Sequence, residues 1–163
     1  SQPITPTLIT DTREQTPLRF EHYPSLRGTL QTGDYSIQGL EDEFCVERKT
    51  LDDLIGCMTR ERDRFERELH RMRGYRFARV LIVGRLTDLE TGEYRSMMDA
   101  KAARHTMYAW EARYSPVVFC FQPAAAVAGE LVERWAYWFA REYARRADVM
   151  CRAAGKNERK ECA

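Results

Sequence analysis

The chain has 163 residues, of which 44% are hydrophobic and 31% are charged, and its formal net charge is +1. The hydrophobic fraction excludes disorder over most of the chain, and the length predicts one folded domain over residues 1–154. The small net charge excludes a strongly basic or acidic protein, so overall charge does not identify a partner.

The first fifty residues carry three strand patterns separated by turn residues. Segments 7–12, 29–37 and 44–49 are apolar or alternating, and a Gly-Asp pair interrupts the second of them. Segment 13–28 carries two prolines and ends in glycine, so we predict a loop there. Together these segments predict a hairpin or a meander.

The spacing of apolar residues becomes helical after residue 50. It predicts two helices, at 51–59 and 62–73, and Thr50 is a suitable cap for the first. Further along, the patterns predict a buried strand at 78–84, a loop at 87–94, a helix at 96–114, a strand at 116–121, a helix at 126–147 and a flexible tail at 155–163. This order predicts an α/β fold with a mixed central β-sheet flanked by helices.

The five cysteines and three histidines form no metal-ligand spacing. Isolated cysteines favour free thiols in a reducing compartment. We find no signal peptide and no apolar run of about 18 residues. The sequence therefore predicts a soluble cytoplasmic protein, nuclear if the source is eukaryotic, with no membrane partner and no zinc.

Acidic residues stand at the ends of all three early strands: Asp11, Asp34 and Glu47. Lys49 follows Glu47 by two residues, so the two side chains share one face of the strand. Clustered carboxylates repel each other, and Mg²⁺ commonly binds one or two of them together with water and phosphate. An adjacent ammonium group can contact the phosphate or the attacking water, so the pattern indicates phosphodiester hydrolysis. The alternative is a surface Glu-Lys ion pair beside an ordinary Gly-Asp turn.

These motifs make a known family visible. The segment GDY (33–35) followed by VERKTLDDL (46–54) closely resembles the nuclease core of the XPF-type (ERCC-type) structure-specific endonucleases. Their signature is GD, then ERK, three residues and D, and the family is similar to the PD-(D/E)XK restriction-endonuclease-like superfamily. The resemblance extends over residues 7–85 through the segments ITDTRE (9–14), RFERELHRM (64–72) and ARVLIVG (78–84).

The resemblance implies a DNA endonuclease that depends on Mg²⁺ or Mn²⁺ and acts on branched, flap or fork DNA. By matching positions, Asp34 and Glu47 would be metal ligands, and Lys49 would contact the scissile phosphate and water. Further catalytic residues in supporting roles would be Asp11, Glu14, Arg48 and Asp53. For Arg48 two readings stay open, because it either orients the carboxylates from behind or forms an ordinary salt bridge with Asp53.

The sequence departs from the family pattern in three places. No pair of helix-hairpin-helix units follows the nuclease region, the 13–28 segment carries prolines where larger relatives tend to have a helix, and Glu68 stands where relatives often carry glutamine. The chain therefore resembles a minimal, bacterial or phage-type member.

Arginines after the motif are candidates for DNA binding. Arg60, Arg64, Arg67 and Arg71 are spaced by three and four residues, which places them on one helical face if the helix runs through. The strip either contacts phosphates or is a solvated face with alternating charges. Arg64 matches an arginine of the family, so it is the strongest candidate, followed by Arg60 and Arg67.

The aromatic residues of the last helix favour a structural role over base stacking. Trp135, Trp138 and Phe139 fall on one predicted stripe, which indicates a core or dimer face. Members of the family usually pair their nuclease domains, so we expect a homodimer. Three alternatives to a branched-DNA endonuclease remain: a nuclease acting on plain duplex or single strands, a catalytically inactive scaffold for DNA binding or dimerisation, and a stand-alone interaction module.

Overall fold

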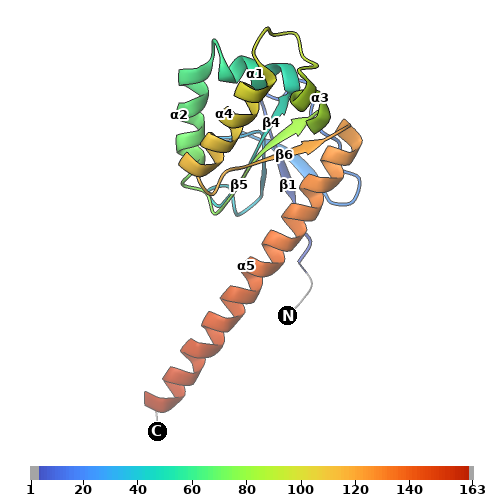
Figure 1. The fold of residues 1–163 in the computed structure, drawn as a ribbon. Coiled ribbons are helices and arrows are strands. Elements are labelled where there is room, and N and C mark those ends of the chain that lie inside the picture. The colour runs from blue at the N-terminus through green and yellow to red at the C-terminus, as the bar shows by residue number, and fades with distance from the viewer. Residues whose placement is uncertain (1–3, 162–163) are drawn as a thin grey trace.

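A six-stranded mixed sheet forms the centre of the molecule (Figure 1). The computed structural model describes residues 4–161, with side chains described through residue 156. The strand order is β2-β1-β3-β4-β5-β6. The strands are β1 (Leu8–Asp11), β2 (Ser25–Gly28), β3 (Tyr35–Ile37), β4 (Phe44–Thr50), β5 (Phe77–Val83) and β6 (Val118–Gln122).

The sheet divides into an antiparallel part and a parallel part. Strand β3 pairs antiparallel with both β1 and β4, whereas β4, β5 and β6 run parallel to one another. At the other edge, β2 pairs parallel with β1. The parallel strands are joined through helices, and β5 is apolar and largely buried, as expected for a strand covered on both faces. The predicted fold class, a mixed sheet flanked by helices, is confirmed.

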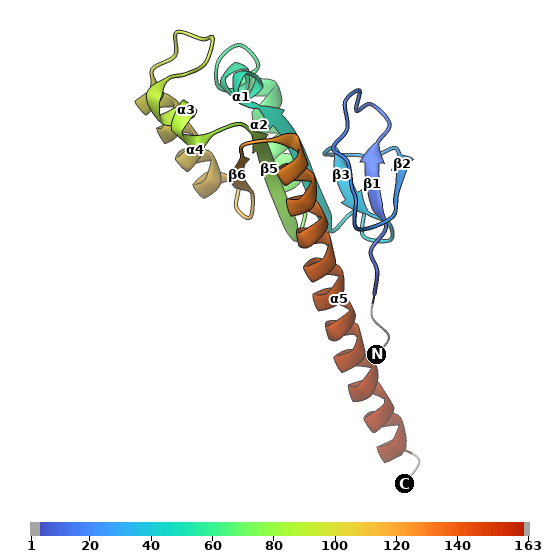
Figure 2. The ribbon, with the colours of Figure 1, turned by 90° about the vertical axis from the view of Figure 1, so that its right-hand side faces the viewer.

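Helices cover both faces of the sheet and form two separate cores. The helices are α1 (Leu51–Met58), α2 (Arg62–Met72), α3 (Leu86–Thr91), α4 (Ala100–Arg113) and α5 (Ala125–Glu161). On one face, α1, α2, α3 and α4 contribute to a core that contains Leu54, Phe65, Leu69 and Trp110. On the other face α5 packs over Tyr35, Phe44 and Val46. Figures 1 and 2 show the C-terminal half of α5 projecting beyond the sheet.

Small residues let α5 approach the rest of the protein closely. Its buried stripe is Ala128, Val132, Ala136 and Ala140, which recur every four residues. A Cβ atom at Gly129 would stand 2.4 Å from the carbonyl oxygen of Arg19, so only glycine fits this contact. Two of the predicted aromatic residues flank the stripe, but the third, Trp138, is 62% exposed. The prediction that Trp138 shares that stripe is therefore wrong, because it lies on the opposite side of the helix.

Four segments differ from the predicted elements. Strand β2 lies inside the predicted 13–28 loop; its side chains are largely exposed at the sheet edge, so no alternating pattern revealed it. Helix α3 occupies part of the predicted 87–94 loop and ends at Gly92, which adopts a left-handed φ of 77°. Of the predicted 29–37 strand only the last three residues are strand. Residues 155–161 continue α5 where we predicted a tail, and 162–163 lie outside the described residues.

The junction between β4 and α1 fixes the position of Lys49. Strand β4 ends at Thr50, and α1 begins at the next residue. The Thr50 hydroxyl accepts a hydrogen bond of 3.1 Å from the backbone N–H of Asp53, and two aspartates occupy the first turn. The predicted cap is therefore confirmed, and it holds Lys49 one residue before a rigid turn.

Within residues 4–161, no helix combines the length and hydropathy that crossing a bilayer requires.

Candidate active site

Alternation along β4 sends neighbouring side chains to opposite faces of the sheet. Cys45 belongs to the core beneath α1 and α2, and Val46 belongs to the core beneath α5. Glu47 and Lys49 therefore share the α1–α2 face, as the sequence predicts. Glu47 is 7% exposed, and the Nζ atom of Lys49 lies 3.4 Å from its Oε1 atom. This part of the prediction holds in the structure.

A glycine brings Asp34 to the same place. Gly33 adopts a φ of 84°, and a Cβ atom there would lie only 2.6 Å from the Sγ atom of Cys45. Because only glycine allows this approach, the chain can pass close to β4 and then donate a 2.8 Å hydrogen bond from Asp34 N to Val46 O. The Oδ2 atom of Asp34 accepts a 2.8 Å hydrogen bond from the backbone N–H of Arg48.

Burial and neighbouring charges raise the pKa values of both Asp34 and Glu47. Burial raises the pKa of Asp34 to about 7, and the charges of Glu14 and Glu68 add to this rise, although the hydrogen bond from Arg48 N and the charge of Lys49 oppose it. Burial, followed by the charge of Asp34, raises the pKa of Glu47 well above its usual range. The ammonium group of Lys49 lowers both pKa values, but it does not outweigh burial and the neighbouring carboxylates.

Lys49 itself keeps its proton. Burial is the largest single influence and would lower the pKa of Lys49, but the charges of Glu47, Cys57 and Glu68 together leave this pKa above its ordinary value. Its Nζ atom also lies 5.6 Å from the ring centre of Phe65 on α2. The side chain is held as a cation between β4 and α2.

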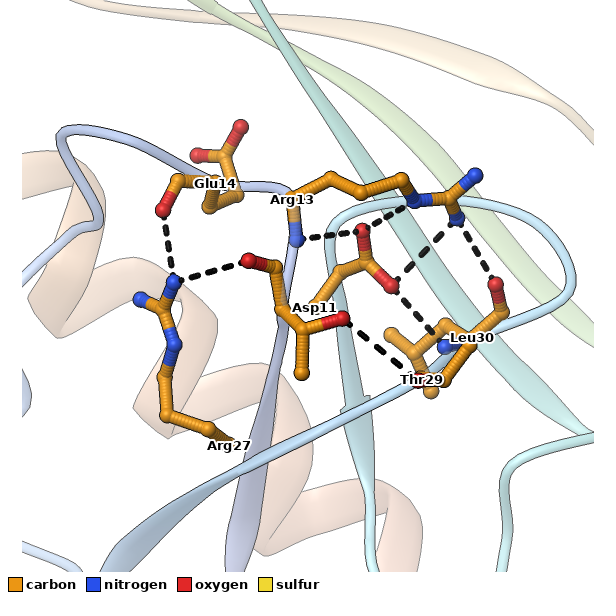
Figure 3. A network of polar contacts seen from close by, with 7 residues as sticks. Asp11, Arg13, Glu14, Arg27, Thr29 and Leu30 are labelled. Atoms are coloured by element: carbon orange, nitrogen blue, oxygen red, sulfur yellow. Dashed lines mark hydrogen bonds and ion pairs between the residues drawn. The ribbon is translucent and has the colours of Figure 1, made fainter.

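Asp11 is a neighbour of Asp34 through a backbone hydrogen bond, and Figure 3 shows the contacts of its carboxylate with Arg13 and Leu30. The backbone N–H of Asp11 donates to the carbonyl of Asp34 at 2.8 Å. Its carboxylate accepts hydrogen bonds from Arg13 Nε at 2.7 Å and from the backbone N–H of Leu30 at 2.9 Å. Burial tends to raise the pKa of Asp11, but these hydrogen bonds lower it overall. Asp11 thus connects the loops that carry Arg13 and Leu30. The guanidinium group of Arg27 donates hydrogen bonds to the carbonyl oxygens of Thr12 and Glu14 and so holds the following turn.

Arg48 and Glu14 meet on the opposite side of β4. The Nη1 atom of Arg48 lies 3.8 Å from Glu14 Oε2 and also donates to the carbonyl of Thr16. The same Glu14 oxygen accepts a 3.0 Å hydrogen bond from the Tyr35 hydroxyl. The expected salt bridge with Asp53 does not form among the described side chains, because Arg48 pairs with Glu14 instead. The other reading, that Arg48 orients the carboxylates, stays a prediction. Asp53 is exposed in the first turn of α1 and forms no ion pair within the described side chains.

Two hollows meet at Lys49 and Asp53. One, of about 270 Å³, is also lined by Arg60, Arg64 and Glu68. The other, shallower and of about 530 Å³, is also lined by Arg13, Glu14, Gln15, Thr16, Arg48 and Thr50. Lys49 thus lies where two solvent-open hollows with arginines in their walls adjoin.

The candidate DNA-binding arginines do not form one helical strip. Helices α1 and α2 are separate, and Arg60 lies in the turn between them, so the continuous helix required for the strip is absent from this part of the structure. The break nevertheless directs Arg60 and Arg64 to the same hollow. Arg64 is 82% exposed and lies 3.6 Å from Glu61, whereas Arg67 is exposed on α2 and does not line the hollow.

Two neighbours of the site were not among the predicted site residues. Arg13 lies two residues after Asp11, inside the ITDTRE segment. The charges of Asp34 and Glu47 contribute to raising its pKa. Glu68 lies one helical turn after Arg64 and raises the pKa of the same two carboxyl groups. Two sequence signals could have pointed to Glu68: its helical spacing from Arg64, and its position where relatives of the family often carry glutamine.

The donor set fits a hard divalent cation. Asp34 and Glu47 offer carboxylate oxygens, and burial together with the neighbouring carboxylates raises the pKa of each. Among residues 4–156, no group of three or more His, Cys, Asp or Glu side chains has a metal-holding arrangement. This is compatible with Mg²⁺, which usually takes one or two carboxylates and completes its shell with water and phosphate.

Comparisons with known proteins identify a matching sequence family and two similar folds. The sequence model of the ERCC4 domain matches residues 10–132. The fold is similar to a structure of XPF from Aeropyrum pernix, with a TM-score of 0.63 and 18% identity over 80% of this chain and 60% of that one. It is also similar to XPF from Aeropyrum pernix in complex with DNA, with a TM-score of 0.64 and 18% identity over 84% and 66%. The chain thus spans less than two thirds of either solved chain. A search of curated proteins gave no match.

Proposed function

The chain belongs to the ERCC4 domain family, and on that premise we propose that it is a divalent-metal-dependent endonuclease that hydrolyses phosphodiester bonds in DNA. The observation that carries the proposal is the convergence of two carboxylates and one ammonium group: Asp34 is held by a 2.8 Å hydrogen bond from Arg48 N, and Lys49 Nζ lies 3.4 Å from Glu47 Oε1. A structural ion pair would match one carboxylate with one ammonium group, whereas here two carboxylates share a single ammonium group, which favours the binding of a further cation.

Asp34 and Glu47 would hold the cation, Mg²⁺ or Mn²⁺. When bound, such a cation neutralises charge on the phosphate and lowers the pKa of a coordinated water. The hydrogen bond from Arg48 N fixes the direction of the Asp34 carboxylate, and the ion pair with Lys49 fixes that of Glu47. Both ligands are therefore oriented before any cation arrives, which reduces the free energy needed to order them.

The chain's own cations would receive the DNA backbone. The ammonium of Lys49 can donate to a non-bridging oxygen of the scissile phosphate or to the attacking water, and its raised pKa keeps it charged in neutral solution. Arg60 and Arg64, in the wall of one hollow, and Arg13, in the wall of the other, are placed to bind flanking phosphates. The strand would then cross the site at Lys49.

The preference for branched, flap or fork DNA is part of the proposal and follows from family membership. The similar solved structure with DNA supports DNA as the partner. Pairing of two copies is proposed on the same basis, and sedimentation at micromolar concentration tests it, because a monomer there would contradict pairing.

A cleavage assay tests the proposed function. Flap, fork and plain duplex DNA are incubated with the wild-type chain and with Glu47→Gln, first with Mg²⁺ and then with Mn²⁺. We expect the wild type to cut, with flap or fork preferred, and Glu47→Gln to lose about 1,000-fold in rate because a ligand charge is removed without a change of size. A wild type that binds DNA but cuts none of the three with either cation would instead support an inactive scaffold.

A further inference from the structure

Glu68 faces the candidate site from helix α2, not from the sheet. The buried side of α2 consists of Phe65, Leu69 and Met72. Glu68 is one residue before Leu69, is partly buried, and lines the same hollow as Lys49 and Arg64. Its side chain is therefore at the edge of the core, in the hollow that Lys49 also lines.

The partners of Glu68 differ from those of the other glutamates near α2. Glu61 pairs with Arg64 at 3.6 Å, and Glu66 pairs with Arg62 at 3.1 Å. Among the side chains that the structure describes, no lysine or arginine forms an ion pair with Glu68. Its side chain instead lies within hydrogen-bonding reach of Glu47.

Glu68 acts on the charge of the whole site. After burial and Asp34, it is the next contribution that raises the pKa of Glu47, and it also raises the pKa of Asp34. Glu68 also raises the pKa of Lys49, so its charge attracts that ammonium group. Among the described side chains it has no arginine partner, and it repels the two other carboxylates.

We infer that Glu68 is a positioning residue whose negative charge strengthens divalent-cation binding by Asp34 and Glu47. The inference rests on the proposed function. Because these acids do not form a three-carboxylate metal group in the described residues, Glu68 acts through its charge and through Glu47, not as a direct ligand. Through Glu68, helix α2, which also carries Arg64, would contribute to cation binding at the site.

This role predicts two opposite effects of removing the Glu68 charge: higher stability without the cation and weaker cation binding. Without a divalent cation, Glu68→Gln removes a like charge and raises the midpoint of thermal unfolding by about 3 °C. With the cation, the same variant loses attraction and binds about tenfold more weakly, as is typical for residues just outside the ligand set. A residue that only supports packing would lower stability equally under both conditions.

The experiment uses magnesium chloride alone, without DNA. Thermal unfolding and titration calorimetry at about pH 8 compare the wild type with Glu68→Gln, with Asp34→Asn as the ligand variant. Asp63→Asn is the matched control, because Asp63 lies on the same helix, is exposed and does not line the hollow. We expect weaker Mg²⁺ binding and higher cation-free stability for Glu68→Gln, and unchanged Mg²⁺ binding for Asp63→Asn.

The outcomes separate this inference from the proposed function. If Asp34→Asn abolishes Mg²⁺ binding and Glu68→Gln binds like the wild type, the inference is wrong and the proposed metal site stands. Equal losses in Glu68→Gln and Asp63→Asn also overturn it, because the effect would then be general charge. If Asp34→Asn binds like the wild type, the proposed metal site is wrong, and the comparison of Glu68→Gln with Asp63→Asn still decides whether Glu68 strengthens cation binding.

Discussion

Glu47 and Glu133 are both buried glutamates, yet they lie in opposite kinds of surroundings. Glu133, on α5, is 1% exposed and accepts hydrogen bonds from the backbone N–H groups of Glu21, His22 and Tyr23 at 3.3, 2.7 and 2.8 Å. Glu47, 7% exposed, has carboxylates for neighbours and one ammonium group. Burial of a carboxylate is therefore not in itself a sign of function. The hydrogen-bond partners distinguish the two residues. Glu133 accepts hydrogen bonds that hold the 21–23 loop against α5, whereas Glu47 lies among other carboxylates and is a candidate cation ligand.

The largest expected effect tests the structural role of Glu133. Glu133→Ala leaves three backbone N–H groups without their acceptor and should lower the free energy of unfolding by about 3 kcal/mol. Denaturant titration measures the loss. DNA cleavage, assayed well below the unfolding midpoint, should stay at the wild-type rate because the site lies on the other face of the sheet. A loss of cleavage without a loss of stability would contradict the assignment of Glu133 to structure.

A smaller effect concerns pH on the carboxylate-pair side. The pKa of Asp34 is raised in the folded state to about 7, so the folded chain binds more protons than the unfolded chain between about pH 4 and pH 7. Stability should therefore fall as pH rises through this window, by up to about 1 kcal/mol per pH unit, in the absence of divalent cations. The measurement is the difference between the wild type and Asp34→Asn. A difference that is independent of pH, or that rises with pH, would contradict the description of the pair.

The smallest expected effect concerns DNA binding by the arginines at the surface of the site. Arg64→Ala should weaken DNA binding by about 1 kcal/mol and reduce the slope of log affinity against log salt by about one, because one phosphate contact is lost. Arg67→Ala is the matched control on the same helix, since Arg67 is exposed but does not line the hollow. Fluorescence anisotropy over a salt series checks both variants. Equal changes in the two would mean that α2 binds DNA diffusely and not through the hollow.

Several features of the fold were predictable because their causes are local. The period of apolar residues located α1, α2 and β5, and the Thr50 cap fixed where β4 gives way to α1. Strand β2 and helix α3 were missed for a physical reason. An exposed edge strand of four residues and a six-residue helix bury too few side chains to leave a periodic signal.

The chemistry at the site was predictable in kind and less so in arrangement. Spacing along β4 was enough to predict that Glu47 and Lys49 share a face, because strand alternation is a local rule. The partner of Arg48 was not predictable, since Glu14 reaches it from a loop more than thirty residues earlier in the chain. Glu133 also escaped notice, although an acid on the apolar stripe of a helix was a sign that something had to satisfy it.

By itself, the sequence determined which chemical groups the protein has, their order along strands and helices, and the Gly-Asp and Glu-Arg-Lys motif that places the chain in its family. Only the tertiary structure decided which carboxylates are satisfied and which are left facing one another. The reason is that burial and repulsion depend on distances between segments far apart in the chain. The Asp34 contact spans 14 residues and the Glu133 contacts span 110 to 112.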